Sequence, residues 1–240
     1  IQTRYEDPEI VLNKISSGGK NEFVPLMQEI YSKPINKDLI IKRVNEIKQN
    51  GGIAALSGTP QAAIKFKQTL IEANPDLFFL QATVVSTKHI GSDGQEILDI
   101  RNLCETLRIP VIAGNCVTYD VAKLLMKEGV SGLMVGIGPG AACTSRGVLG
   151  IGIPQATAIS DCSSAREDFF NDTGKYIPII ADGGIVTGGD ICKCLACGAD
   201  AVMIGSPIAR ATSAPGKGFH WGMATPSQIL PRGTRIEVGS

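Results

Sequence analysis

The sequence lacks an excess of charge of either sign and has no long apolar run. Its 23 Lys and Arg residues balance 23 Asp and Glu residues, so the formal net charge at pH 7 is zero. Because nucleic-acid binding needs a basic surface that neutralises several phosphates, no nucleic-acid partner is expected. The longest uncharged stretch, residues 129–145, contains Gly136, Gly138, Pro139 and Gly140. A membrane helix needs about 20 apolar residues, so no membrane partner is expected either.

A basic segment followed by an apolar one, the mark of a secretory signal, is also missing from the start of the sequence. The seven cysteines are odd in number. Together these features predict reduced thiols in a cytoplasmic protein rather than a disulfide framework. With 43% hydrophobic and 19% charged residues the composition is globular, which excludes intrinsic disorder. The length predicts one domain, residues 1–240.

Six apolar segments of strand length recur, and their nearly continuous hydrophobicity is typical of strands buried on both faces of a parallel sheet. The predicted strands are Gly52–Ser57, Asp76–Thr83, Pro110–Gly114, Gly132–Gly136, Pro178–Ala181 and Ala201–Gly205. Helical patterns separate or precede them, at Asn36–Gln49, Pro60–Ala73, Gln95–Leu107, Tyr119–Glu128, Gln155–Asn171 and Gly189–Cys197. Thr59 and Pro60 are an expected N-cap and first helical residue, and Gly129 an expected C-cap.

This alternation predicts an α/β fold, either a doubly wound sheet or a (β/α)8 barrel. Polar, glycine-rich segments follow the fourth, fifth and sixth strands, where barrels hold phosphate sites and catalytic groups, so the barrel is favoured. The chain begins with Ile1 and offers six strands where a barrel has eight. Since six strands would leave two open edges, the sequence is expected to be a fragment of the barrel, with its first βα units and its C-terminal end missing.

The densest chemical signal is residues 135–155, in which Gly136, Gly138, Gly140, Gly147 and Pro139 surround Cys143 directly after a predicted strand. Such a loop lets backbone groups approach a ligand or cation while it presents one thiol. A nucleophilic cysteine needs this kind of polar, partly exposed position. The alternative is an ordinary glycine-rich turn with a small buried cysteine.

Two further segments lie at the ends of the last two predicted strands. Asp182 is followed by Gly183 and Gly184, and Gly205 is followed by Ser206. The backbone N–H groups of such turns, with a serine hydroxyl, can hold a phosphate, while the aspartate can bind ribose hydroxyls. Tight turns without a ligand are the alternative.

The segments GIGPGAACTSRGVLGIGIPQATAI and PIIADGGIVTGGDICKCLACGADAVMIGS, with the later WGM, resemble the IMP dehydrogenase/GMP reductase family. The resemblance begins near Ile41 and is strongest to members that lack the CBS regulatory module. It implies a (β/α)8 TIM barrel of which this chain supplies strands three to eight. It also implies a homotetramer and a role in purine and GMP biosynthesis.

By this resemblance, Cys143 is the nucleophile that adds to carbon 2 of IMP, NAD accepts the hydride, and water releases XMP. Ser145 accompanies Cys143 as a catalytic residue. The resemblance implies substrate binding by Asp182, Gly183, Gly184, Gly205, Ser206, His220, Gly222 and Met223. It implies NAD binding by Gln81, Asn115, Gly136, Ile137 and Gly138. A potassium ion would be held by the backbone carbonyls of Gly138, Gly140 and Cys143.

Some residues depart from the family's usual pattern. The family usually has Ser at Ala141, Thr at Ser145, often Tyr at His220, and at Gln81 the Asp that binds the NAD ribose. His220 could compensate for the hydroxyl missing at Ala141. The long flap with its water-activating Arg-Tyr pair is reduced to Ala224–Ile229, which leaves Arg232 and Arg235 as candidates for that role by position only.

Two other functions remain open at this point. A GMP reductase would share the thiol and the nucleotide pocket but would use NADPH to expel ammonia. A nucleotide-binding paralogue without turnover would keep only the pocket. The ADGGI segment and the Ser of MIGS resemble the dehydrogenases, whereas the short flap does not.

Other features receive structural interpretations. Cys192, Cys194 and Cys197 are expected to pack in the core, because on a helix Cys192 and Cys194 point about 200° apart and cannot share one metal. The charged run Ala165–Lys175 is expected to be a solvated helix end. Phe219–Trp221 fits either core packing or the lining of a purine pocket.

Overall fold

The centre of the molecule is a sheet of six parallel strands. The structure, a computed structural model, describes residues 1–19, 23–89, 98–222 and 235–238. The sheet has the order β1-β2-β5-β6-β7-β8, and every neighbouring pair is parallel. Its strands are β1 (Ala55–Gly58), β2 (Leu77–Gln81), β5 (Val111–Cys116), β6 (Gly132–Val135), β7 (Ile179–Asp182) and β8 (Ala201–Met203). All six predicted strands are confirmed, as is the partial barrel.

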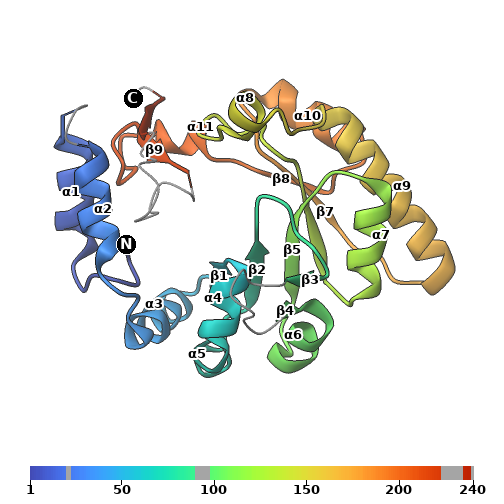
Figure 1. The fold of residues 1–240 in the computed structure, drawn as a ribbon, viewed down its shortest axis with the longest axis horizontal. Coiled ribbons are helices and arrows are strands. Elements are labelled where there is room, and N and C mark those ends of the chain that lie inside the picture. Colours follow the sequence, from blue (N-terminus) through green and yellow to red (C-terminus); the bar gives the residue numbers. More distant parts are fainter. Residues whose placement is uncertain (20–22, 90–97, 223–234, 239–240) are drawn as a thin grey trace.

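Helices cover the convex side of this curved sheet (Figure 1). They are α3 (Lys37–Gln49), α4 (Pro60–Lys65), α5 (Lys67–Ala73), α6 (Ile100–Leu107), α7 (Tyr119–Lys127), α9 (Gln155–Thr173) and α10 (Gly188–Ala196). Two short helices, α8 (Ser145–Leu149) and α11 (Ser206–Ala209), follow strand ends. In the part of the chain that the structure describes, no helix has both the length and the apolarity that crossing a membrane requires.

The burial of each strand follows its position in the sheet. All four residues of β6 are buried, as are five of the six in β5, because these central strands have neighbours on both sides and helices against one face. The edge strands β1 and β8 pair on one side only within the described residues, and their side chains are exposed or half-buried. The continuous apolar runs therefore predict the central strands most closely.

The expected N-cap at Thr59 is confirmed, whereas the C-cap expected at Gly129 is Glu128, directly before it. The Thr59 side chain accepts a hydrogen bond from the Ala62 N–H ahead of Pro60, and Gly129 has a φ of +90°. The single helix predicted over Pro60–Ala73 is wrong: the chain breaks it at Phe66, whose backbone leaves the helical region (φ −110°, ψ 16°) while its side chain is buried beside Val44.

The helix predicted over Gln95–Leu107 begins later than expected, at Ile100. Asp99 is its N-cap, and the Asp99 side chain accepts a hydrogen bond from the Asn102 N–H. Leu98–Asp99 forms instead the short strand β4, which pairs with β3 (Lys88–His89). The start of the predicted helix lies outside the described residues.

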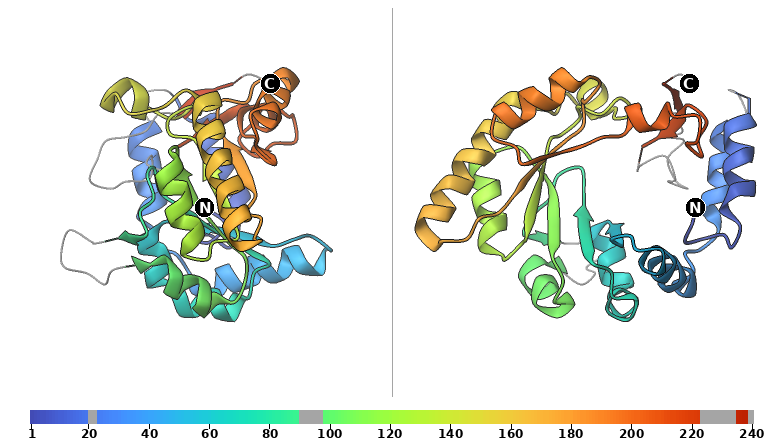
Figure 2. Two further views of the ribbon diagram at one scale, coloured as in Figure 1. Left: turned by 90° about the vertical axis from the view of Figure 1, so that its right-hand side faces the viewer. Right: turned by 180° about the vertical axis from the view of Figure 1, so that it is seen from behind.

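Two pairs of elements are not predicted by the sequence. Helices α1 (Pro8–Ser17) and α2 (Phe23–Ser32) lie across from the arc of helices, beside β9 (Phe219–Trp221), as the two views of Figure 2 show. Strand β9 pairs in antiparallel fashion with β10 (Arg235–Glu237). The buried side chains of α1 and α2 form a hydrophobic cluster of their own: Val11, Ile15, Phe23, Met27 and Ile30.

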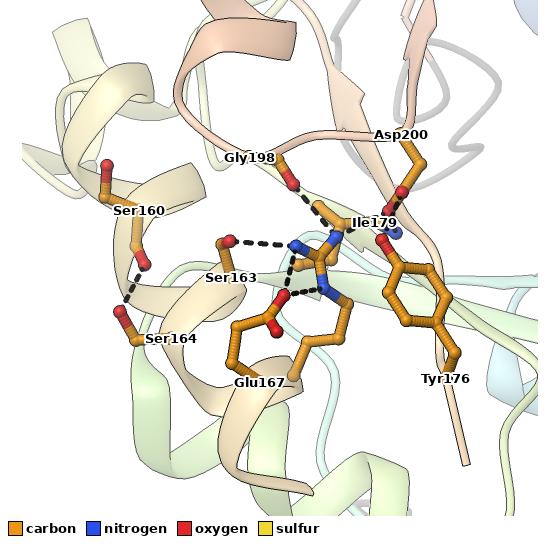
Figure 3. Close-up of polar contacts among 9 residues, drawn as sticks. Ser160, Ser163, Ser164, Glu167, Tyr176, Ile179, Gly198 and Asp200 are labelled. Carbon is orange, nitrogen blue, oxygen red and sulfur yellow. Dashed lines mark hydrogen bonds and ion pairs between the residues drawn. The ribbon is translucent and has the colours of Figure 1, made fainter. Parts of the chain in front are cut away.

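The solvated helix end expected over Ala165–Lys175 is confirmed for residues 170–175, which are all exposed, but not for Arg166, which is buried. Its side chain is only 7% exposed and donates to Asp200 Oδ2 at 2.8 Å and to the Gly198 carbonyl at 3.0 Å. Asp200 also accepts from the Tyr176 hydroxyl and the Ile179 N–H. Arg166 also donates to Ser163 and Glu167, which lie on α9. Figure 3 shows these two residues across from Gly198 and Asp200, which come directly before β8. This network ties α9 to the starts of β7 and β8.

We expect Arg166→Met to lower the free energy of unfolding by about 3 kcal/mol, because it leaves the Asp200 carboxylate without its cation. Denaturant unfolding followed by circular dichroism measures the change. The matched control is Arg101→Met, which breaks the exposed pair with Glu128 and is expected to cost less than about 1 kcal/mol. Equal losses in the two variants would contradict this role for Arg166.

Candidate active site

A cavity of about 850 Å³ lies at the carboxyl ends of the parallel strands. Barrels carry their active sites at this end. The turns after β2, β6, β7 and β8 all contribute to it, together with Asn115 near the end of β5 and with β9. The predicted site residues that line it are Gln81, Asn115, Gly136, Ile137, Gly138, Gly140, Cys143, Ser145, Asp182, Gly183, Gly184, Gly205, Ser206, His220 and Gly222. Met223 and Arg232 lie outside the described residues, and Arg235 begins β10.

Cys143 stands exposed in the turn between β6 and α8. Its Sγ lies 3.3 Å from the Ser145 Oγ, and its N–H donates to the Gly140 carbonyl at 3.0 Å. Of the seven cysteines, Cys143 alone lines the cavity. The turn therefore presents one accessible thiol beside a hydroxyl, and the interpretation of Cys143 as a buried residue of an ordinary turn is wrong.

Arg146 holds the two ends of this turn together, which the sequence analysis missed. Its Nε donates to the Ile137 carbonyl at 3.1 Å and its Nη2 to the Ile153 carbonyl at 2.6 Å. A Cβ at Gly138 or Gly152 would stand within 2.6–2.7 Å of Arg146 atoms. The two glycines on either side of one arginine were the available signal, since only glycine leaves the guanidinium room.

Asn115 links the turn after β6 to the end of β7. Its side-chain Nδ2 donates to the Gly136 carbonyl at 2.7 Å and to Asp182 Oδ2 at 2.8 Å. Burial raises the pKa of the Asp182 carboxyl, and the bond from Asn115 opposes that rise. Asp182 thus lies at the cavity wall as an acceptor whose charged form is poorly solvated.

The turn after β7 packs directly on the cysteine turn. Gly183 and Gly184 have φ values of +93° and +79°, a region that favours glycine. A Cβ at Gly183 would stand 2.9 Å from Pro139 Cγ and 3.0 Å from the Gly140 nitrogen. The backbones therefore approach more closely than any side chain would allow.

Ser206 and His220 form a polar pair on the opposite wall. Ser206 opens α11, His220 is the middle residue of β9, and the Ser206 Oγ lies 3.2 Å from the His220 Nε2. Burial lowers the pKa of His220, which favours the neutral ring. A hydroxyl and an imidazole, with the Gly205 backbone beside them, make a set of groups able to bind a phosphate.

Gln81, the last residue of β2, also lines the cavity. Its Nε2 contacts Met134 Sδ at 3.6 Å. Val24, Thr83 and Val148 also line the cavity and were not predicted as site residues. Trp221 lines it as well, which agrees with the pocket-lining alternative for Phe219–Trp221.

The CKCLAC segment is less uniform than predicted. Cys194 is buried and Cys197 half-buried, as a packing role requires, but Cys192 is exposed because it lies on the outer face of α10. No group of three or more His, Cys, Asp or Glu side chains able to hold a metal occurs among the described residues.

Asp182→Asn tests the effect of burying this carboxylate. A raised pKa means that the folded state holds the proton more tightly than the unfolded state does. Its carboxylate therefore costs stability as the pH rises from the usual aspartate pKa through the raised one. We expect the melting temperature of Asp182→Asn minus that of the unchanged protein to increase as the pH rises through that window. A pH-independent difference in melting temperature would contradict this.

The sequence was compared with protein families and with individual proteins. A model of the IMP dehydrogenase / GMP reductase domain matches residues 40–225. An uncharacterised oxidoreductase of Mycobacterium tuberculosis is 39% identical over 217 residues, which are 90% of this chain and 58% of that protein. The IMP dehydrogenase of Cryptosporidium parvum is 42% identical over 154 residues, 64% of this chain and 36% of that protein. The chain thus spans little more than half the length of the mycobacterial relative.

Solved structures agree with these matches. An IMP dehydrogenase/GMP reductase-like protein of Corynebacterium glutamicum superposes with a TM-score of 0.87 at 34% identity, covering 98% of this chain and 62% of that one. A GMP reductase of Trypanosoma brucei in complex with guanosine 5'-monophosphate gives a TM-score of 0.51 at 28% identity, covering 62% of this chain and 29% of that one. By its sequence and its partial barrel, this chain belongs to the IMP dehydrogenase/GMP reductase family.

Proposed function

We propose that this chain carries the active site of an oxidoreductase that converts IMP to XMP with NAD, through a covalent bond to Cys143. The observation that carries the proposal is the exposed thiol beside Ser145 in a cavity whose other walls hold Asp182 and the Ser206–His220 pair. The same cavity thus offers a nucleophile, a ribose acceptor and a phosphate site. Its volume of about 850 Å³ is near the upper end of the usual range for small-molecule sites, about 300–1,000 Å³, as two ligands require.

In this mechanism the Cys143 thiolate adds to carbon 2 of the hypoxanthine ring, and the hydrogen on that carbon leaves as a hydride. The result is a thioimidate between Cys143 and the purine. Water then adds to carbon 2, the thiol departs, and XMP is released. Ser145 contacts the sulfur and can hydrogen-bond the thiolate. Asp182 accepts hydrogen bonds from the ribose hydroxyls. The turns that contain Gly183, Gly184, Gly205 and Ser206 bind the phosphate.

NAD, when bound, supplies the hydride acceptor. The residues that would hold it are Gln81, Asn115, Gly136, Ile137 and Gly138, which line the cavity beside Cys143. The Asn115 amide is fixed by its bonds to Gly136 and Asp182. Gln81 stands where the family usually has the Asp that binds the NAD ribose. Its hydrogen bond to the ribose would therefore join two neutral groups.

On this proposal a potassium ion would be held by the backbone carbonyls of Gly138, Gly140 and Cys143. All three belong to one six-residue turn, and Gly138 has a φ of +79°, which only glycine adopts readily. Oxygen ligands of this kind suit a hard cation. The ion would fix the backbone on both sides of the thiol. The tetramer implied by the resemblance and the cytoplasmic location expected from the cysteines remain predictions.

GMP reductase is the second candidate, favoured by the structural match to the Trypanosoma brucei enzyme. It would use the same thiol and the same nucleotide walls but would consume NADPH and release ammonia. Purified protein separates the candidates. IMP with NAD should yield NADH and XMP, whereas NADPH oxidation with GMP would indicate the reductase. Nucleotide binding without either reaction would leave a binding paralogue.

Labelling by 6-chloropurine ribonucleotide tests the nucleophile itself. The thiolate displaces chloride from carbon 6 of a purine held in the site, and intact-mass spectrometry measures the adduct. We expect one adduct on the unchanged protein and none on Cys143→Ala. Cys192→Ala, which removes the other exposed thiol, should label normally.

Ser145→Ala should slow this labelling roughly tenfold, as expected for the loss of one hydrogen bond to a charged group. IMP should protect Cys143 from the reagent. Labelling of Cys192 in place of Cys143, or labelling that IMP does not slow, would remove the basis of the proposal.

A further inference from the structure

The α1–α2 helices reach the cavity from outside the part of the chain that the family model matches. That match begins at residue 40, whereas α1 and α2 end at Ser17 and Ser32. Val24, in the first turn of α2, lines the cavity together with His220 and Trp221. The Corynebacterium glutamicum structure covers 98% of this chain and therefore includes most of the same segment.

A hydrogen bond joins these helices to the cavity wall. The Trp221 Nε1 donates to the Tyr31 hydroxyl at 3.0 Å, across 190 residues of sequence. The Trp221 ring also packs against the buried cluster of α1 and α2. Burial raises the pKa of Tyr31, so its hydroxyl remains neutral and available as the acceptor. A second, exposed bond runs from Lys217 Nζ to Asn13 Oδ1 at 2.9 Å.

The segment 219–222 is not part of the main sheet, and besides the Trp221–Tyr31 contact it lies against α11 and β10. Strand β9 pairs only with β10 among the described residues, and the two form a separate sheet. Each residue beside Trp221 nevertheless touches the site. His220 contacts Ser206, and a Cβ at Gly222 would lie 3.5 Å from the Ala142 carbonyl, next to Cys143. A shift of Trp221 would therefore move both His220, which contacts Ser206, and Gly222, which lies beside the Cys143 turn.

We propose that the α1–α2 helices form part of the purine-nucleotide site, with Tyr31 as a positioning residue that acts through Trp221. Val24 and Trp221 provide an apolar wall, and the Tyr31 hydroxyl fixes the ring of Trp221 so that His220 and Gly222 meet the bound nucleotide. The inference rests on the proposed function, because it assigns these residues to the same nucleotide site. It adds a specificity element that the barrel strands do not supply.

The test measures the rate of Cys143 labelling by 6-chloropurine ribonucleotide as a function of reagent concentration, in the full-length protein. Tyr31→Phe removes only the hydroxyl. We expect the half-saturating concentration to rise about 3- to 10-fold, the usual effect of one lost hydrogen bond, while the maximal rate stays within about twofold. A purely structural role would lower the melting temperature without this separation of the two constants.

Tyr5→Phe is the matched control. The Tyr5 hydroxyl donates to the Ile30 carbonyl at 2.9 Å within the same helical unit, but Tyr5 does not contact Trp221 through a hydrogen bond. Its half-saturating concentration should equal that of the unchanged protein. Equal constants for Tyr5→Phe and Tyr31→Phe, with normal labelling of the unchanged protein, would overturn the role of Tyr31. Absence of saturable labelling in the unchanged protein would instead overturn the proposed function.

A double-mutant cycle keeps the inference testable if Tyr31→Phe also lowers stability. In the Trp221→Phe protein the indole donor is gone, so adding Tyr31→Phe should leave the half-saturating concentration unchanged. An additional rise of the same size as in the unchanged protein would mean that Tyr31 acts independently of Trp221, and the proposed path would be wrong.

Discussion

The close approach of two backbone turns is the constraint on which the rest of the site depends. A Cβ at Gly136 would stand 2.4 Å from the Asp182 carbonyl, and one at Gly183 would stand 2.9 Å from Pro139. Because no side chain separates the turns after β6 and β7, the thiol of Cys143 and the carboxylate of Asp182 share one cavity. Any larger residue at these positions would push the two turns apart and separate the Cys143 thiol from the Asp182 carboxylate.

The same closeness has an energetic cost. Packing the turns together buries Asp182, whose charged form then loses solvent, and the Asn115 amide compensates only in part. At the opposite end of the strands, Arg166 and Asp200 join α9 to the starts of β7 and β8. This buried charge has a direct ionic partner, whereas the Asp182 carboxylate at the cavity has only the Asn115 amide.

The sequence predicts the sheet and the glycine-rich turns well, since both depend on local patterns. Continuous apolar runs define β5 and β6, and the convergence of parallel strand ends brings Cys143, Asp182 and Ser206 to one cavity. The burial of Arg166 is not predictable in this way, because its partner Asp200 lies 34 residues away in the chain. The same holds for α1 and α2, whose contact with Trp221 spans 190 residues.

The site therefore combines two parts with different origins in the chain. The Cys143 thiol, the Asp182 carboxylate at the end of β7 and Ser206 lie within the residues that match the family model. Val24 and the hydroxyl that bonds Trp221 come from helices outside it. In the proposed mechanism the attack of Cys143 on the purine uses only the first part, whereas the positions of His220 and Gly222 depend on both. On this proposal, changes in α1 and α2 alter the fit of the nucleotide and leave the covalent step intact.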